Sequence, residues 1–573
     1  MNKHALYHKS ESEYCFPIDE HNVLIRFRTA RQDNDIASIT LVYNMCAYFP
    51  RKQKRMEMKL AKQDSLFDYY EATLSSDIPS FMYLFEIRLN DGKKCYYDEF
   101  GYQDNIALID CGTRAFRVPF VNSKNILKVN EKFEGDVVYQ IFPERFNLGN
   151  HNKDKSYITR DWNSKDMRGN QFNRNVFLGG DLQGIIAKLD YIKDLGVDII
   201  YMTPINKSSS NHKYNVEDYY KIDEHFGDDE TFKNLVDLAH EKGLKIVMDL
   251  VFNHSSKDHP FFQDVLAKGK ESKYYNFYCM QDKPLKTDNL NYYSFNSCGY
   301  MPKLNSNNPE VQDYFAKVGE YYLNKFHVDG FRLDVANEVS HDFWINFNKR
   351  VKAIDPNCII IGENWDNAHR FLRNIEFDGV MNYQFFTVCW DFFIHHRLTA
   401  PDFTGNLNWL LTRYEDSANR NSFTLIDSHD TGRFYNFCKG NKDIYLLGLL
   451  TQISYVGLPM IYYGDEIFMM GGADPDNRRG MAWNSEEFNS SYHQLFKDIV
   501  KLRKLKAFRS GDINIKEDNG LIYIDRFNKM SSYTVIMNNN NETKEVIADT
   551  VILSNRFNNN TLGAFGFAVI KNK

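Results

Sequence analysis

The sequence predicts an α/β protein: a (β/α)8 TIM barrel with an N-terminal β-sandwich, a small subdomain inserted after the third barrel strand, and a C-terminal β-sandwich. Three observations predict this order. Short runs of alternating apolar and polar residues open the chain, strand-like and helix-like segments then alternate for about 370 residues, and alternating runs return near the end. We place the domains at 1–125, 126–506 and 507–573, with the insertion at about 253–303.

The amino-terminal part alternates with a period of two residues, which is typical of strands buried on one face. Residues 22–28 and 37–43 show this pattern, and polar breaks separate such runs. The polar segment 119–132 precedes a different style of sequence. We therefore predict a β-sandwich that ends at a domain boundary.

Eight β-branched or aromatic runs follow, separated by amphipathic stretches such as 182–195 and 231–242. Eight strands that alternate with helices suit a closed parallel barrel better than an open doubly wound sheet, which remains the alternative. An irregular, aromatic-rich excursion at 253–302 is long enough for a lid or a small subdomain. The expected strands are 137–142, 197–203, 244–251, 328–334, 358–363, 378–382, 422–427 and 460–464. After residue 507 the runs 521–527 and 533–537 predict a closing β-domain.

The charge balance argues against a nucleic-acid partner, because 70 lysines and arginines stand against 76 acidic residues. The first ten residues lack the apolar stretch of roughly 7 to 15 residues that a secretory signal needs, and no run of about 18 apolar residues predicts a membrane span. The nine cysteines form no CxxC pair, which argues against a disulfide framework and a zinc site. We expect a cytoplasmic protein without nucleic-acid or membrane partners.

Acidic residues stand at the carboxyl ends of several predicted strands, where the loops of a TIM barrel share one face. They are Asp249, Asp334, Glu363 and, after the seventh strand, Asp430. Singly, each has a structural explanation, such as an ion pair between Asp334 and Arg332 or a helix cap at Asp430. Jointly they indicate function, because carboxylates on one rim repel one another. Cleavage of a glycosidic bond needs an acid for the leaving oxygen and a carboxylate beneath the anomeric carbon.

The segments around these acids resemble the α-amylase family of glycoside hydrolases and, within it, the neopullulanase, cyclomaltodextrinase and maltogenic amylase group. They are DLVFNH at 249–254, GFRLDVANE at 330–338, GENW at 362–365 and SHD at 428–430, which are similar in order and spacing to the four core regions of the family. The resemblance implies a retaining hydrolase without an organic cofactor. Its implied substrates are cyclodextrins, maltooligosaccharides or pullulan, cleaved at α-1,4 and sometimes α-1,6 bonds, with some transglycosylation.

The resemblance also implies a role for each matching residue. Asp334 is the implied nucleophile, Glu363 the implied general acid and base, and Asp430 the third carboxylate, which grips hydroxyls of the distorted sugar. The resemblance also implies a set of substrate-binding residues: His212, Tyr214, His254, Phe295, Arg332, Trp365, His429, Asp474 and Arg478. For Tyr214 and Trp365, packing in the core is the alternative interpretation.

One segment of the chain corresponds to a metal-binding loop of the family. The resemblance leaves two interpretations open, that this segment binds calcium or that it does not. Leu148 and Lys153 stand at positions that usually coordinate the ion, which weakens the likeness. Oxygen-bearing residues are nevertheless close by. The implied ligands are Asn147, Asn150, Asp154, Gly179 and Asp181.

Two rival functions share this fold. A glucosyltransferase or isomerase uses the same carboxylates and differs in how well water reaches the covalent intermediate. A non-catalytic glucan-binding protein would not need all three acids. Ser297 stands where relatives usually show a second Phe after Phe295, so the preference for acceptors stays open. The amino-terminal sandwich of this group often docks on a partner subunit, so the resemblance implies a homodimer.

Overall fold

The computed structural model describes residues 1–106, 113–119, 121–149, 156–162, 175–281, 290–372 and 375–572. Its centre is a closed barrel of eight parallel strands, in which β11 pairs with β12 on one side and with β20 on the other. The closed barrel confirms the predicted fold class and excludes the open sheet. The barrel strands are β11 (Val138–Ile141), β12 (Ile199–Met202), β15 (Lys245–Val251), β16 (Gly330–Asp334), β17 (Ile359–Gly362), β18 (Gly379–Asn382), β19 (Phe423–Thr424) and β20 (Leu458–Tyr462).

Apolar side chains from different strands fill the interior of the barrel. Val138, Ile199, Val247, Ile359 and Met460 belong to one fully buried cluster. These residues come from β11, β12, β15, β17 and β20, so the interior is a packed core and the loops at the strand ends are left to form a site.

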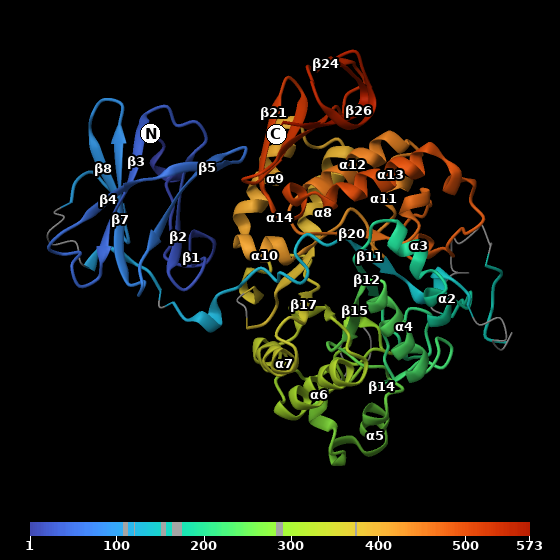
Figure 1. Cartoon of the computed structure of the whole chain (residues 1–573). Helices are drawn as coiled ribbons and strands as arrows, with labels where there is room; N and C mark the ends of the chain where they lie inside the picture. Colours follow the sequence, from blue (N-terminus) through green and yellow to red (C-terminus); the bar gives the residue numbers. More distant parts are fainter. Residues whose placement is uncertain are drawn as a thin grey trace.

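Helices connect the strands and cover the outside of the barrel (Figure 1). The stretch predicted as one helix at 182–195 forms two short helices. Asp181 accepts a hydrogen bond from the amide of Gly184 and so caps the first of them. The helices are α1 (Pro143–Phe146), α2 (Leu182–Ile186), α3 (Leu189–Asp194), α4 (Asp229–Glu241), α6 (Pro309–Phe326), α7 (His341–Ile354), α8 (Tyr383–Phe393), α9 (Ala400–Arg413), α10 (Asp416–Asn421), α11 (Phe434–Phe437), α12 (Lys442–Ser454), α13 (Ser491–Lys501) and α14 (Lys506–Ser510).

The insertion after β15 is more regular than the sequence indicated. It contains α5 (Pro260–Lys268), which His259 caps and in which Pro260 takes the first helical position. Isolated bridges join other described residues of the insertion, among them His254 to Lys303. The excursion therefore forms a small structured unit beside the carboxyl ends of the strands.

The amino-terminal domain is a sandwich of two antiparallel sheets, as predicted. One has the order β1-β2-β6-β5, and the other β4-β3-β7-β8-β9, with β10 paired to β7. Alternate residues of β2, namely Val23, Ile25 and Phe27, are fully buried against the facing sheet. The strands are β1 (Cys15–Pro17), β2 (Asn22–Ala30), β3 (Ile36–Met45), β4 (Lys54–Glu57), β5 (Lys59–Gln63), β6 (Phe67–Ser75), β7 (Phe81–Leu89), β8 (Lys94–Asp98), β9 (Gly101–Gln103) and β10 (Phe116–Arg117).

The carboxyl-terminal β-domain forms one connected antiparallel sheet, in which β26 pairs with β23, β24 and β25. One face packs on the barrel through residues such as Ile524 and Val535, and a second cluster with Val546 and Leu562 covers the other side. The strands are β21 (Asp512–Asp518), β22 (Leu521–Phe527), β23 (Ser532–Met537), β24 (Lys544–Glu545), β25 (Val551–Asn558) and β26 (Thr561–Lys571).

The amino-terminal sandwich contacts α9 and the carboxyl-terminal sheet (Figure 1). Arg26 Nη1 donates to the carbonyl of Thr412 at 3.0 Å, and Lys62 Nζ donates to the carbonyl of Ile513 at 2.7 Å. A side chain at Gly405 in α9 would place its Cβ 2.8 Å from the backbone nitrogen of Ser65. Only glycine therefore lets the two domains approach this closely.

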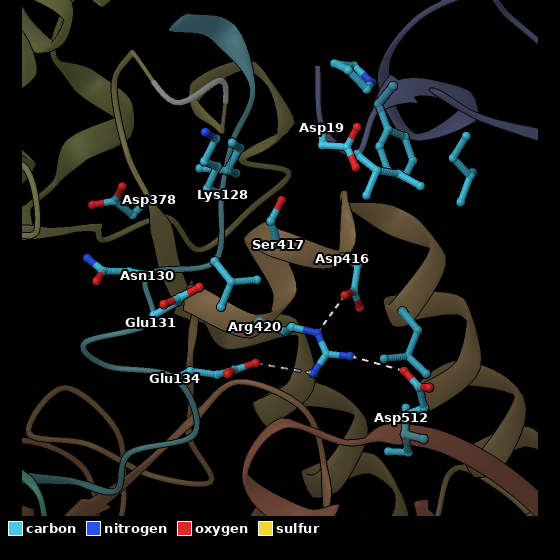
Figure 2. A pocket seen from close by; sticks show the side chains of 18 of the residues that line it. Asp19, Lys128, Asn130, Glu131, Glu134, Asp378, Asp416, Ser417, Arg420 and Asp512 are labelled. Atoms are coloured by element: carbon cyan, nitrogen blue, oxygen red, sulfur yellow. Dashed lines mark hydrogen bonds and ion pairs between the residues drawn. The ribbon is translucent and has the colours of Figure 1, made fainter. Parts of the chain in front are cut away.

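A cavity of about 1070 Å³ lies where the three domains meet (Figure 2). Arg420 joins the barrel domain to the carboxyl-terminal domain there: its guanidinium lies 2.6 Å from Asp416, 3.4 Å from Asp512 and 3.9 Å from Glu134. Asp378, which lines the cavity, directly precedes β18. The cavity is thus at the amino-terminal end of the barrel strands, away from the end where a TIM barrel carries its active site.

Within the described ranges, no helix combines the length and the apolar character that crossing a membrane requires.

Candidate active site

Three adjacent barrel strands bring acidic residues to one end of the barrel. Asp249 lies in β15, in register with Arg332 of β16. Asp334 is the last residue of β16, and Glu363 follows the last residue of β17. Asp430 arrives from the turn between β19 and α11. Because parallel strands end at the same rim, residues distant in sequence become neighbours.

Arg332 is the common partner of all four acids. Its Nη1 lies 2.9 Å from Oδ1 of Asp334 and 3.1 Å from both carboxylate oxygens of Asp249. Its Nη2 lies 3.1 Å from Oε1 of Glu363 and 3.9 Å from Oδ2 of Asp430. The guanidinium is fully buried. One planar cation therefore gathers the three predicted catalytic carboxyls around a single point.

Burial raises the pKa of two of these carboxyls, Asp249 and Asp334. It raises the pKa of Asp249 to about 6, although Arg332 and two tyrosine hydroxyls act in the opposite direction. Burial and then the charge of Glu363 raise the pKa of Asp334 well above its usual range, and Arg332 offsets only part of this shift. Asp249 and Asp334 therefore retain a proton more readily than separate exposed acids would.

Tyr214 and His429 form a hydrogen-bonded chain beside the acids. Tyr214 donates its hydroxyl proton to Asp249 at 2.9 Å and lies 2.6 Å from Nε2 of His429. Gln140 Nε2 donates to Nδ1 of His429 at 2.8 Å, while Gln140 Oε1 accepts from the backbone amide of His429. These contacts place the ring proton on Nε2. Burial, with smaller contributions from Arg478 and Arg332, lowers the pKa of His429 and keeps the ring neutral.

Asp474 and Arg478 join the site from the loop after β20. Arg478 Nη1 lies 3.1 Å from Asp474, and its Nη2 lies 3.2 Å from Oδ1 of Asp430. The Nε of Arg478 donates to the carbonyl of His429 at 2.7 Å. The loop after β20 is thus fixed against the turn that carries Asp430.

Trp365 projects from the loop that follows Glu363. Its indole nitrogen donates to Oε1 of Glu363 at 3.0 Å, and the backbone amide of Val335 donates to Oε2 at 2.8 Å. The indole stacks on Tyr383, with ring centroids 3.7 Å apart and an angle of 9°. About half of Trp365 is exposed, so a ring face bordering the acid stays open to solvent.

The three remaining predicted sugar contacts lie around this cluster. His212 stacks on Tyr214, with ring centroids 5.9 Å apart. His254 stacks on Phe295 of the insertion, with centroids 4.9 Å apart. Burial, aided by Lys303, lowers the pKa of His254 to about 3, and its Nε2 is buried without a partner among the described residues. A sugar hydroxyl is a suitable partner for this nitrogen.

The predicted calcium ligands are only partly within the described residues, because Asn150 and Asp154 lie outside them. Asp181 caps α2, and its Oδ1 accepts from the amides of Gly149 and Gly184. Asn147 donates to the carbonyl of Gly184, and Gly179 donates to Glu144. Among the described residues no three His, Cys, Asp or Glu side chains gather as a metal site would need. Asn side-chain oxygens and backbone carbonyls also bind calcium, so the site stays a prediction.

Several neutral residues of the site escaped sequence reasoning. Gln140 and Tyr201 come from β11 and β12, and Tyr201 donates to Asp249 at 2.7 Å. Tyr383 supports Trp365 from the first position of α8. The position of Tyr383 after a barrel strand was the one available signal, since strand ends meet at the site.

A closed parallel barrel whose carboxyls surround one buried arginine at the strand ends has the architecture of a TIM-barrel glycosidase. Comparison with protein families identifies the family of this chain. The family described as "Alpha amylase, catalytic domain" matches residues 140–520, and "Alpha amylase, N-terminal ig-like domain" matches residues 1–122. The chain belongs to the α-amylase family of glycoside hydrolases.

Relatives with related names cover nearly the whole chain. It is 39% identical to a cyclomaltodextrinase of Thermoanaerobacter pseudethanolicus, over 96% of this chain and 94% of the relative. It is 36% identical to neopullulanase 2 of Thermoactinomyces vulgaris, over 95% and 92%. A solved cyclomaltodextrinase structure superimposes with a TM-score of 0.90 at 31% identity and covers all of both chains.

Proposed function

We propose that this enzyme hydrolyses α-1,4 glucosidic bonds, and to some extent α-1,6 bonds, in cyclodextrins, maltooligosaccharides or pullulan. The observation that carries the proposal is the contact of Asp334, Glu363 and Asp430 with the single guanidinium of Arg332. Relatives named cyclomaltodextrinase, maltogenic α-amylase and neopullulanase support this range of substrates. The family retains the anomeric configuration, as a double displacement requires.

The residues divide the reaction into two displacements. Asp334 attacks the anomeric carbon, the glycosidic bond breaks, and Glu363 gives its proton to the leaving oxygen. Water then attacks the glucosyl ester, Glu363 takes a proton from it, and the carboxylate of Asp334 leaves. Asp430, held by Arg478 at 3.2 Å, binds hydroxyls of the distorted sugar. Two inversions at one carbon give net retention.

The surroundings of Glu363 fit the change from acid to base. The Val335 amide and the Trp365 indole fix its two oxygens, so its carboxyl keeps one orientation through both steps. The open face of Trp365 borders the leaving-group side. A glucan in place of water at this position would give transglycosylation instead of hydrolysis.

Incubation with β-cyclodextrin and with maltotriose, followed by product chromatography, tests the proposal. Glucose and maltose are expected as main products, and longer chains would mark a transferase. The Glu363→Gln variant is expected to lose several orders of magnitude in kcat while its substrate affinity changes little, because the proton donor is gone and the binding surface remains. Unchanged substrates with the wild-type protein, or normal turnover in the variant, would refute the assignment.

We further propose a homodimer in the cytoplasm. Large apolar side chains are exposed on the amino-terminal domain, which supports contact with a second copy; they are Tyr48, Ile78 and Phe100. A relative named intracellular maltogenic amylase from Bacillus subtilis, 35% identical, supports the location. Calcium binding stays a prediction, since two of the five expected ligands lie outside the described residues.

A further inference from the structure

A buried amide holds the turn that carries Asp430. Nδ2 of Asn477 lies 2.7 Å from the carbonyl oxygen of His429 and 2.7 Å from that of Thr431, with the carbonyl of Ser428 at 3.4 Å. Asn477 is fully buried. The two protons of its amide thus bind the carbonyls on both sides of Asp430, and these bonds fix the backbone of the turn.

Asn477 is itself held from the opposite side. The Nε of Arg433 donates to the backbone carbonyl of Asn477 at 2.9 Å, and its Nη1 donates to the carbonyl of Tyr463 at 2.8 Å and pairs with Asp465 at 3.1 Å. Tyr463 directly follows β20. Asn477 and Arg433 therefore link the turn that carries Asp430 to the end of barrel strand β20 by hydrogen bonds.

Only the donor end of the amide is used. Oδ1 of Asn477 is buried without a hydrogen-bond partner among the described residues. Aspartate has almost the same shape but would present only acceptor oxygens to the two carbonyls, so the turn would be repelled rather than held. An isosteric exchange can thus remove the interaction without creating a cavity.

We propose that Asn477 is a positioning residue for Asp430. The side-chain amide of Asn477 fixes the turn so that the carboxyl of Asp430 can contact the distorted sugar in the transition state. This inference rests on the proposed glycosidase function and adds a residue to that site. The residue that positions Asp430 thus lies in the loop after β20, directly before Arg478.

The chain offers a matched control in its carboxyl-terminal domain. Nδ2 of Asn538 donates to the carbonyls of Glu542 at 2.8 Å, Leu562 at 3.2 Å and Gly563 at 3.0 Å, and Asn538 is also fully buried. Asn477→Asp and Asn538→Asp therefore each set a carboxylate against backbone carbonyls. Only the first exchange lies beside the active site.

The experiment compares kcat and KM of both variants on maltotriose, at a temperature at which circular dichroism shows both to be folded. Asn477→Asp is expected to lose about 100-fold in kcat with little change in KM, because a displaced catalytic group costs chiefly transition-state binding. Asn538→Asp is expected to stay within a few-fold of wild type in kcat. Asn477→Ala, which removes the amide donor without adding charge, replaces the first variant if that variant does not fold.

A double-mutant cycle shows whether the effect passes through Asp430. In an Asp430→Asn background, the exchange at Asn477 is expected to cost less than about 5-fold, because the group that it positions is already lost. Retention of kcat in folded Asn477→Asp, an equal loss in Asn538→Asp, or an undiminished loss in the Asp430→Asn background would each overturn the inference. Inactivity of the wild-type protein on every α-glucan would instead refute the proposed function.

Discussion

At the scale of single residues, the site depends on one cation among four carboxyls. Arg332 is fully buried, and three of its four acidic partners are within 3.1 Å. A buried cation and buried acids are costly to desolvate separately, so their mutual pairing is what makes the arrangement possible. Lysine in place of Arg332 could not contact the acids along two edges of a plane.

Asp249 makes the stability of the protein depend on pH. Its folded pKa of about 6 is above the ordinary value of 3.8, so between these pH values the folded protein holds a proton that the unfolded chain has released. Stability therefore falls as pH rises through this window, by about 2 to 3 kcal/mol for this group. The stability advantage of the wild type over Asp249→Asn is expected to shrink by that amount between about pH 4 and about pH 7.

Urea unfolding of both proteins across this range measures the effect. Asp190→Asn is the control, because the side chain of Asp190 is 88% exposed. A difference between wild type and Asp249→Asn that does not change with pH would contradict the raised pKa.

The acids of the site could be predicted from the sequence, while their neutral partners could not. Asp334 and Glu363 stand at strand ends. Acidic residues there indicate a functional site, because they do not otherwise stabilise the barrel. Gln140, Tyr201 and Asn477 carry no charge, and a Gln or Tyr inside a strand is indistinguishable from ordinary packing. Their partners are fixed by tertiary contacts, which the local sequence does not contain.

At the scale of elements, strand positions followed from apolar periodicity, and their ends shifted for physical reasons. The seventh strand was expected at 422–427, but barrel pairing covers only β19 (Phe423–Thr424). Leu425, Ile426 and Asp427 are still buried, so burial continued where backbone pairing had ended. An apolar run in the sequence therefore predicts which residues are buried better than it predicts which residues form backbone hydrogen bonds in a strand.

Helix packing shows the same limit. Gly319 lies inside α6, where propensity alone would favour alanine. A Cβ at this position would lie 2.6 Å from the ring of Phe347 and 2.9 Å from Val351, both in α7. The glycine is required by the close approach of two helices, and a single sequence gives no sign of the neighbour that imposes it.

At the scale of the whole molecule, three domains are joined by few but specific contacts. Arg420 connects α10, the segment before the barrel and the carboxyl-terminal sheet (Figure 2). The order of the domains along the chain followed from the change in periodicity. Their mutual placement did not, because it depends on backbone carbonyls such as those of Thr412 and Ile513, which any residue would supply.

The proposed homodimer yields a prediction at this scale. Sedimentation velocity at micromolar concentration should show a species of twice the chain mass of 67.4 kDa. Replacement of Tyr48 and Phe100 by Ser is expected to shift it toward the monomer, because both side chains are more than 60% exposed in a single chain. A purely monomeric wild-type profile would contradict the dimer and leave the catalytic account intact.

Asp334 is expected to form the covalent bond to the sugar, while Glu363 donates and then accepts the proton. Incubation of the Glu363→Gln variant with α-maltosyl fluoride tests it, since fluoride leaves without an acid and the missing base slows release of the ester. Peptide mass spectrometry is expected to find a maltosyl group on the carboxyl of Asp334. The same group on Asp249 or Asp430, or no adduct although the variant releases fluoride, would contradict the account.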